Sequence, residues 1–247
     1  MPPTLTSELQ PRREGGIRCS VLFGDFVDLR LADCMDVMRE YPDKHFDLAI
    51  ADPPYGLGQD GHAGSVRVSD GKQLRRVFEQ KEWDKQIPPA EYFVELRRVS
   101  KNQIVWGGNY MTAHLPPSRC WVTWDKVQRD LCMADGESAW TSFDEPSRIW
   151  TRHRKVLWDE KPIHPTQKPV KLYKWLLMKY AQPGWRILDT HLGSGSSAIA
   201  ALDMKYELLG CEISEQYFAT AVERIGRYES QGTFDMTPNS ALCVGGG

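Results

Sequence analysis

The sequence predicts an α/β fold in which a mostly parallel sheet lies between helices. Short apolar runs such as Phe46–Ile50 and Arg186–Asp189 end in turn residues, as buried strands of parallel sheets do. The segments between such runs carry apolar residues at helical spacing. Strands that alternate with helices in this way indicate strand–helix–strand units. With 247 residues, the chain is long enough for one large domain or for one domain with a modest insertion.

The first strand–helix–strand unit extends from Leu29 to Ala51. Leu29–Ala32 alternates apolar and polar residues, and Cys34–Tyr41 repeats apolar residues at helical spacing until Pro42 stops it. Asp33 closes the first strand at the edge of the sheet where ligands bind. Its carboxylate can cap the following helix or accept a hydrogen bond from an adenine amino group, and the sequence leaves both roles open.

The turn Asp52–Tyr55 follows the strand at 46–51 and has the sequence Asp-Pro-Pro-Tyr. It presents a carboxylate that can only accept, a backbone restricted by two prolines, and an aromatic ring. Asp52 and the Pro53 carbonyl can accept the two hydrogens of an exocyclic amine, while Tyr55 can stack on the ring that carries this amine. The turn therefore predicts a site for an amine-bearing planar base.

The middle of the chain is expected to continue the sheet beyond a long loop. The loop spans 56–89, includes a short helix near Gln73–Gln80, and is either solvated surface or a lid that orders on substrate. A helix at 89–100, a strand at 104–106 and a strand at 121–124 follow. Gly107 and Gly108 end the strand at 104–106, where they permit close approach of a ligand or a neighbouring segment.

Residues 126–163 differ in composition from the rest of the chain, because they combine basic and aromatic side chains. Clustered cations among aromatic rings suit phosphates and unstacked bases, although a surface hairpin would have a similar composition. The cations expected to bind DNA are Arg148, Arg152, Arg154 and Lys155.

The C-terminal part has the pattern of a mononucleotide-binding unit. A helix at 172–180 precedes the strand 186–189, the turn that contains Gly193-Ser194-Gly195, a second helix, the strand 208–212 and a last helix over 214–225. Glu212 ends its strand where a carboxylate can bind both ribose hydroxyls. An NAD-dependent dehydrogenase has a similar pattern, but Asp189 directly before the turn would repel a pyrophosphate and favours a cationic, amine-bearing cofactor.

Composition narrows the remaining functions. The net charge of −2 provides no global field that would attract nucleic acid, so such binding must rely on local patches. The six cysteines have no metal-ligand spacing and are expected to be reduced core thiols, which fits a cytoplasmic protein without a metal. No apolar run approaches the roughly 20 residues of a membrane helix. Residues 1–16 and 229–247 are expected to be flexible tails.

Together, Asp52–Tyr55, His164–Pro169 and Asp189–Gly195 resemble the motifs of the DNA methyltransferases that modify N6 of adenine or N4 of cytosine. Their order is similar to that of a permuted group, in which the catalytic Asp-Pro-Pro-Tyr precedes the motif that binds S-adenosylmethionine. The resemblance extends from about Leu29 to Ile225. It implies a Rossmann-like methyltransferase fold with a seven-stranded, mostly parallel sheet, one antiparallel edge strand and flanking helices. The domain would span 17–228, with a target-recognition insertion at 126–163.

The resemblance also assigns roles to individual residues. It makes Asp52, Pro53, Pro54 and Tyr55 catalytic, and it assigns Asp33, Lys168, Asp189, Gly193, Ser194, Gly195 and Glu212 to the cofactor, S-adenosylmethionine. Thr190-His191 departs from the Pro-Phe that is typical of the family, so the wall of the cofactor pocket is expected to differ.

The function implied is methylation of N6 of an adenine that flips out of double-stranded DNA, as in restriction–modification systems. Asp rather than Ser at the start of Asp52–Tyr55 favours adenine. An N4-cytosine methyltransferase is the main alternative, followed by an RNA methyltransferase and a dehydrogenase. The short recognition region leaves open whether a homodimer completes the DNA site.

Overall fold

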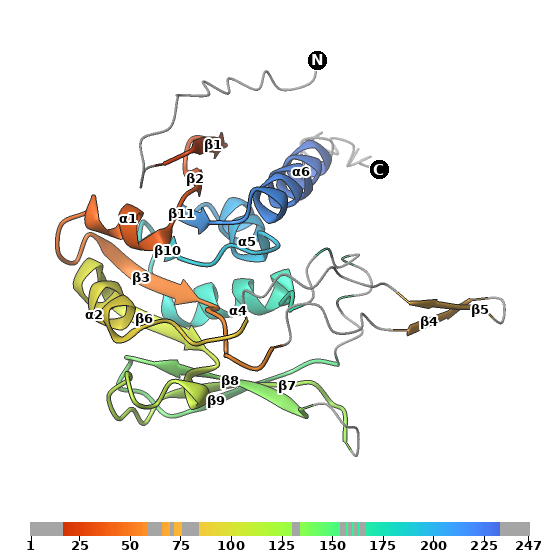
Figure 1. Cartoon of the computed structure of the whole chain (residues 1–247), viewed down its shortest axis with the longest axis horizontal. Helices are drawn as coiled ribbons and strands as arrows, with labels where there is room; N and C mark the ends of the chain where they lie inside the picture. The colour runs from red at the N-terminus through yellow and green to blue at the C-terminus, as the bar shows by residue number, and fades with distance from the viewer. Residues whose placement is uncertain are drawn as a thin grey trace, which may run out of the picture.

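The computed structural model describes residues 17–58, 66–69, 72–75, 84–129, 134–153, 157, 160, 163 and 166–232 (Figure 1). The strands are β1 Cys19–Phe23, β2 Val27–Leu31, β3 Phe46–Ala51, β4 Val66–Ser69, β5 Lys72–Arg75, β6 Ser100–Trp106, β7 Trp121–Asp125, β8 Gly136–Thr141, β9 Arg148–Thr151, β10 Arg186–Asp189 and β11 Glu207–Glu212. The helices are α1 Cys34–Arg39, α2 Ala90–Val99, the 3₁₀ turn η1 Gly108–Tyr110, α4 Val170–Tyr180, α5 Ser196–Met204 and α6 Glu215–Gly232.

The main sheet has nine strands in the order β1-β2-β11-β10-β3-β6-β8-β7-β9. The strands β2, β11, β10, β3 and β6 pair in parallel, and β7 and β9 regain their direction beyond the antiparallel β8. The remaining strand, β1, is antiparallel at one edge. The α/β class and the mostly parallel sheet are confirmed, but the described residues form nine strands of this sheet instead of the expected seven.

The carboxyl ends of three neighbouring strands position the predicted motifs. Because β11, β10 and β3 are adjacent and parallel, Glu212, Asp189 and Asp52 lie at the same edge of the sheet. Residues that are far apart in the sequence thus gather where ligands bind in open α/β sheets.

Helices cover both faces of the sheet. Apolar residues of α4, α5 and α6 pack on one face, and those of α1 and α2 pack on the other (Figure 1). Every residue of β3 is buried, because Leu48 and Ile50 face the α4–α5–α6 side while Ala49 faces the α1–α2 side. The strand that carries Asp52 is therefore fixed by packing on both faces. No helix of the described ranges is long and apolar enough to span a membrane.

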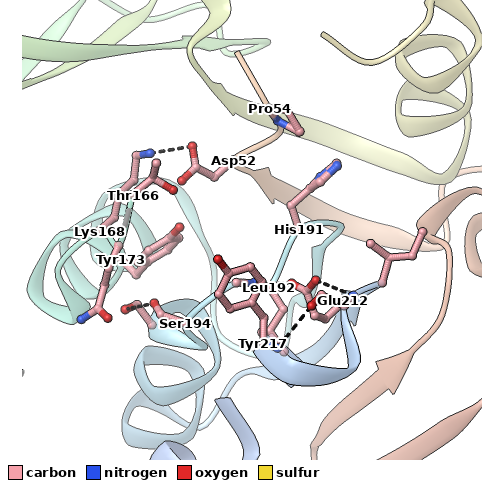
Figure 2. A pocket seen from close by; sticks show the side chains of 15 residues that line it. Asp52, Pro54, Thr166, Lys168, Tyr173, His191, Leu192, Ser194, Glu212 and Tyr217 are labelled. Atoms are coloured by element: carbon pink, nitrogen blue, oxygen red, sulfur yellow. Dashed lines mark hydrogen bonds and ion pairs between the residues drawn. The ribbon is translucent and has the colours of Figure 1, made fainter. Parts of the chain in front are cut away.

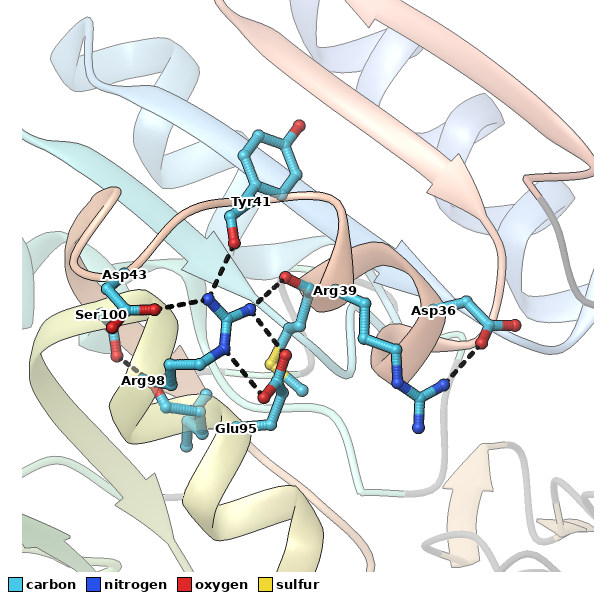
Figure 3. A network of polar contacts seen from close by, with 9 residues as sticks. Asp36, Arg39, Tyr41, Asp43, Glu95, Arg98 and Ser100 are labelled. Atoms are coloured by element: carbon cyan, nitrogen blue, oxygen red, sulfur yellow. Dashed lines mark hydrogen bonds and ion pairs between the residues drawn. The ribbon is translucent and has the colours of Figure 1, made fainter.

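A polar network ties the connection before β3 to α2 (Figure 3). The Arg98 guanidinium donates to the carbonyls of Met38 and Tyr41, at 3.0 and 2.9 Å, at the C-terminal end of α1. It also forms ion pairs with Asp43 at 2.8 Å and with Glu95 at 2.7 Å. Arg98 thus caps α1 and holds the start of β3 against α2.

The described strands within 126–163 belong to the main sheet. Of these, β8 pairs with both β6 and β7, and β9 extends the sheet beyond β7. Trp140 of β8 is 3% exposed and packs among the residues of α2. The polar composition concealed these strands, because only the second half of β8 is buried and Trp150 is the one buried residue of β9.

Two further expectations are corrected. The expected C-terminal tail begins within α6, which continues to Gly232, and Glu229 accepts a hydrogen bond from the Gly24 N–H at 3.0 Å. The prediction of a helix near Gln73–Gln80 is wrong over Gln73–Arg75, because these residues belong to β5, which pairs with β4. Residues 1–16 and 233–247 lie outside the described ranges.

Candidate active site

A cavity of about 250 Å³ lies at the carboxyl edge of the sheet (Figure 2). Asp52 and Pro54 line it from the turn after β3, and Gly193 and Ser194 line it from the turn after β10. Thr166–Lys168 closes another side, directly before α4. The proline turn and the glycine turn therefore share one cavity, which is the arrangement that transfer between two ligands requires.

The two oxygens of the Asp52 carboxylate have different surroundings. Oδ1 lies 2.5 Å from Nζ of Lys168 and accepts the hydroxyl of Tyr55 at 2.7 Å. No described residue donates a hydrogen bond to Oδ2, and Asp52 lines the cavity. One oxygen is thus held by the protein, while the other is available to a ligand.

The Lys168 ammonium is enclosed on all sides. Its side chain is only 1% exposed, and Nζ contacts Asp52, the Tyr55 hydroxyl at 3.0 Å and Glu137 at 3.1 Å. The rings of Tyr55 and Trp106 lie 5.5 and 5.1 Å from Nζ, within the range of cation–π contacts. Lys168 was expected to bind the cofactor; it lines the cavity, and its ammonium pairs with Asp52.

Burial and charge set the protonation of this cluster. Burial raises the pKa of Asp52, although the Lys168 ammonium opposes this shift. Burial alone would lower the pKa of Lys168, but Asp52 and Glu137 outweigh it and raise that pKa, so the ammonium stays protonated. The site therefore combines a permanent buried cation with a carboxylate that binds protons more readily than an ordinary Asp.

Tyr55 is held against the end of β6. Its ring stacks on Tyr110, with centroids 5.5 Å apart, and a Cβ on Gly107 would lie 2.2 Å from Tyr55 Cε1. Gly107 therefore makes room for a neighbouring ring, which settles one of the two roles expected for the glycine pair. Asp84 accepts the backbone N–H groups of Tyr55 and Gly56, at 2.7 and 2.9 Å, and fixes the turn.

The glycine turn is organised by Glu212. Its carboxylate accepts the N–H groups of Gly193 and Ser214, each at 2.9 Å, and thereby joins the turn after β10 to the start of α6. Gly193 and Gly195 have φ angles of +51° and +74°, a region that favours glycine. A Cβ on Gly195 would lie 2.8 Å from Ile225, so this position also needs glycine for packing against α6.

Two predicted cofactor carboxylates do not line the cavity. Asp189 is buried, and its oxygens accept the Ser197 hydroxyl and the His191 N–H. Burial raises the pKa of Asp189 to about 7. Asp33 is exposed and accepts the Met35 N–H at 2.8 Å, which is the capping role that the sequence left open. Both carboxylates satisfy backbone donors at strand ends.

His191, where the chain departs from the family pattern, lies in the cavity wall beside Pro54 (Figure 2). Its Nδ1 lies 2.9 Å from the Thr190 hydroxyl, which in turn lies 2.6 Å from the Tyr92 hydroxyl. Burial lowers the pKa of His191 to about 4, so the ring is neutral near pH 7. A neutral ring places no positive charge next to a cationic ligand.

Several site residues were missed by the motif analysis. Glu137 of β8 lies in no motif, and its partner Lys126 follows β7. Tyr173 and Tyr217 line the cavity, although their helical spacing predicted only core positions. Glu160 accepts the N–H of Val170 at the start of α4, and it also lies in no motif.

The expected DNA-binding cations do not form one cluster among the described residues. Arg148 begins β9 and Arg152 follows it, so the two exposed side chains belong to opposite ends of the strand. Only Arg152 is on the edge of the sheet that carries Asp52. Arg154, Lys155, His164 and Pro165 lie outside the described residues. Within the described ranges, no group of three or more acidic, His or Cys side chains is arranged to hold a metal.

Comparison with known proteins agrees with this architecture. The N6/N4 methyltransferase family model, described as DNA methylase, matches residues 122–223. YubD of Escherichia coli (strain K12), named as a methylase, is 24% identical over 218 residues, which cover 78% of this chain and 87% of YubD. The type II methyltransferase M2.MboI of Moraxella bovis is 22% identical over 237 residues, with 78% and 85% covered.

Solved structures show the same fold. The M1.HpyAVI–SAM complex superposes with a TM-score of 0.53 at 18% identity, over 80% of this chain and 99% of that chain. The cytosine-N4-specific PvuII DNA methyltransferase also gives 0.53, at 11% identity, over 84% and 92%. The Rossmann-like methyltransferase fold is thus confirmed.

Proposed function

We propose that this chain, which is similar to the N6/N4 amino-group DNA methyltransferases, methylates N6 of an adenine in double-stranded DNA. The observation that carries the proposal is Asp52 Oδ2, a hydrogen-bond acceptor without a described partner, in the same cavity as the glycine turn. S-adenosylmethionine is the cofactor of this family, and M1.HpyAVI has been crystallised with it.

The residues of the cavity fit S-adenosylmethionine. Glu212 lines the cavity at the end of β11, where a carboxylate can accept hydrogen bonds from ribose hydroxyls. Gly193 presents backbone without a side chain, and the neutral His191 does not repel a sulfonium. When bound, the cofactor supplies an electrophilic methyl group.

Asp52 then acts on the acceptor amine. The lone pair of the amino nitrogen in adenine is conjugated with the ring, so the free amine is a poor nucleophile. Oδ2 of Asp52 accepts one N–H, and the Pro53 carbonyl accepts the other, which draws both hydrogens out of the ring plane and localises the lone pair. Such alignment can contribute about 7–11 kcal/mol.

Asp52 also accounts for the proton that the amine loses on methylation. Oδ2 is in place to accept it, and the raised pKa of Asp52 favours the transfer. Lys168 and Tyr55 keep Oδ1 fixed throughout. The protein thus provides both the orientation of the amine and the acceptor for its proton.

The base must leave the duplex to reach this cavity. Stacking of the base on Tyr55 remains a prediction, because one face of that ring already lies against Tyr110. Of the expected DNA-binding cations, Arg152 is the described one on the edge that carries Asp52, and we assign it to a DNA phosphate. Arg148, at the far end of β9, is a weaker candidate.

Methylation of cytosine N4 is the second candidate, because the same geometry would hold either amine. The fold does not separate the two, since PvuII methyltransferase, which has this fold, is cytosine-N4-specific. The carboxylate at the first position of Asp52–Tyr55 is the feature that favours adenine.

Product analysis distinguishes these candidates. Unmethylated duplex DNA is incubated with the protein and S-adenosylmethionine, digested to nucleosides and analysed by mass spectrometry, with Asp52→Ala as the blank. We expect N6-methyladenine. N4-methylcytosine would replace the proposed target, and a lack of methylated nucleosides would refute the proposed function.

A further inference from the structure

Glu137 joins the catalytic ion pair to a second ammonium. Its Oε2 lies 3.1 Å from Nζ of Lys168, and its Oε1 lies 2.6 Å from Nζ of Lys126. Lys126, Glu137, Lys168 and Asp52 therefore form a row of alternating charges, and each of these side chains is at most 25% exposed. Glu137 reaches this row from β8, the antiparallel strand between β6 and β7.

Stability alone does not explain the second pair. Asp52 and Lys168 already neutralise each other, and each further ion taken out of water costs several kcal/mol before pairing. Burial acts to raise the pKa of Glu137, but Lys168 and Lys126 outweigh it and lower that pKa to about 2. Glu137 is therefore ionised at neutral pH.

The role of Glu137 follows from the N–H donors of the Lys168 ammonium. An ammonium group has three N–H donors. In this structure Nζ has three polar partners, which are Asp52 Oδ1, the Tyr55 hydroxyl and Glu137 Oε2. With all three donors engaged, none remains for Asp52 Oδ2.

We propose that Glu137 is a positioning residue, which holds the third donor of Lys168 so that Asp52 keeps Oδ2 free for the target amine. Lys126 holds Glu137 in this position from the other side. Without Glu137, the ammonium would turn toward the second oxygen of Asp52 and compete with the substrate. The inference rests on the proposed function and identifies a residue outside its motifs.

Glu137→Gln tests the inference, because it preserves size and removes the charge. We expect kcat to fall by about tenfold to a hundredfold, since the acceptor oxygen is misplaced, while the Kd for S-adenosylmethionine changes less than about twofold. The loss of a neighbouring negative charge lowers the pKa of Asp52, so the acid limb of the kcat/KM profile moves to lower pH. Glu137→Asp, which keeps the charge, should leave this limb in place and lose less turnover.

Asp47→Asn is the matched control. Asp47 is a buried carboxylate at the opposite end of β3, where it pairs with Lys101 at 2.6 Å and accepts the Arg186 N–H at 2.9 Å. The Asp47→Asn substitution should lower the melting temperature, but it should leave kcat and the acid limb of the kcat/KM profile unchanged.

The outcomes distinguish a failure of the positioning role of Glu137 from a failure of the proposed function. If Glu137→Gln retains the kcat of the Asp47→Asn control and an unshifted acid limb, the inference is wrong. If Glu137→Gln does not unfold cooperatively, a wild-type kcat in Glu137→Asp or an acid limb that moves in that variant would overturn it instead. Failure of the wild-type protein to methylate DNA would overturn the proposed function, and the inference with it.

Discussion

The carboxylate of Asp52 and the ammonium of Lys168 form an ion pair with an O–N distance of 2.5 Å. Asp52 belongs to the turn after β3, whereas Lys168 belongs to the segment that leads into α4. Two motifs that are far apart in the sequence therefore meet in one charge pair at the cavity. Through this contact, the segment before α4 both lines the cavity and holds the Asp52 carboxylate.

Lys168→Met should destabilise the protein strongly. It leaves the carboxylates of Asp52 and Glu137 in buried positions without their shared cation, which costs about 3–5 kcal/mol. Lys174→Met, which breaks the more exposed pair with Asp203, should cost less than about 1 kcal/mol. Chemical denaturation of both variants measures the difference, and equal losses would show that the buried pair carries no special weight.

Asp52→Ala should bind S-adenosylmethionine normally and lose turnover. The glycine turn and Glu212, the proposed cofactor site, have no hydrogen bond with Asp52, whereas the proposed acceptor for the amine disappears. A fall of about 10²- to 10⁴-fold in kcat is expected for the loss of a proton acceptor. Calorimetric titration of the cofactor and single-turnover methylation separate the two effects. Methylation by Asp52→Ala at nearly the wild-type rate would exclude the mechanism.

The sequence predicted the part of the site that depends on local patterns. The strands β3, β10 and β11 have strong apolar runs, so the turns that follow them could be placed at one edge of the sheet. The fold class and the shared cavity followed from that placement. The Asp52–Tyr55 turn and the glycine turn could be placed for the same reason, because each follows a strand end.

The sequence could not predict pairings that depend on strand order. Glu137 reaches Lys168 only because β8 lies between β6 and β7, and no local pattern around Glu137 encodes this arrangement. The position of a carboxylate at the end of a strand also did not show whether it binds a cofactor or caps nearby backbone N–H groups. Asp33 and Asp189 both satisfy nearby backbone N–H groups, which compete with a cofactor for the same carboxylates.

Gly107→Ala should disturb the catalytic turn. The added Cβ would lie 2.2 Å from Tyr55 Cε1, so the ring must move and its hydroxyl must leave Asp52. Gly184→Ala is the matched control, because Gly184 also has a positive φ, +80° against +68°, but has no atom within 4 Å of the added Cβ. Alanine is strained by the positive φ at both positions, so a difference in stability between the two variants reports the clash of the added Cβ with Tyr55.

The clash should cost about 1–3 kcal/mol more than the control, together with a clear loss of kcat. Denaturant midpoints and single-turnover rates of the two variants provide the measurement. Equal stability and full activity in Gly107→Ala would mean that the position of Tyr55 does not matter for turnover.

The buried carboxyl of Asp189 predicts a pH dependence of stability. Burial raises its pKa from the ordinary value of 3.8 to about 7. Between these values the native state binds more protons than the unfolded state, so the free energy of unfolding falls as pH rises. The loss is complete above about pH 7 and amounts to at most about 4 kcal/mol.

Asp189→Asn removes this titration and keeps an oxygen that can accept the His191 N–H. Relative to the wild-type protein, the variant should therefore gain stability as pH rises from about 4 to about 7, measured by denaturant unfolding without cofactor. The lowered pKa of His191 acts in the opposite direction, because its stabilising effect is lost as pH falls from 6.5 toward about 4. Both proteins retain His191, so the comparison cancels its contribution. A difference that does not change with pH would show that Asp189 is ionised throughout this range.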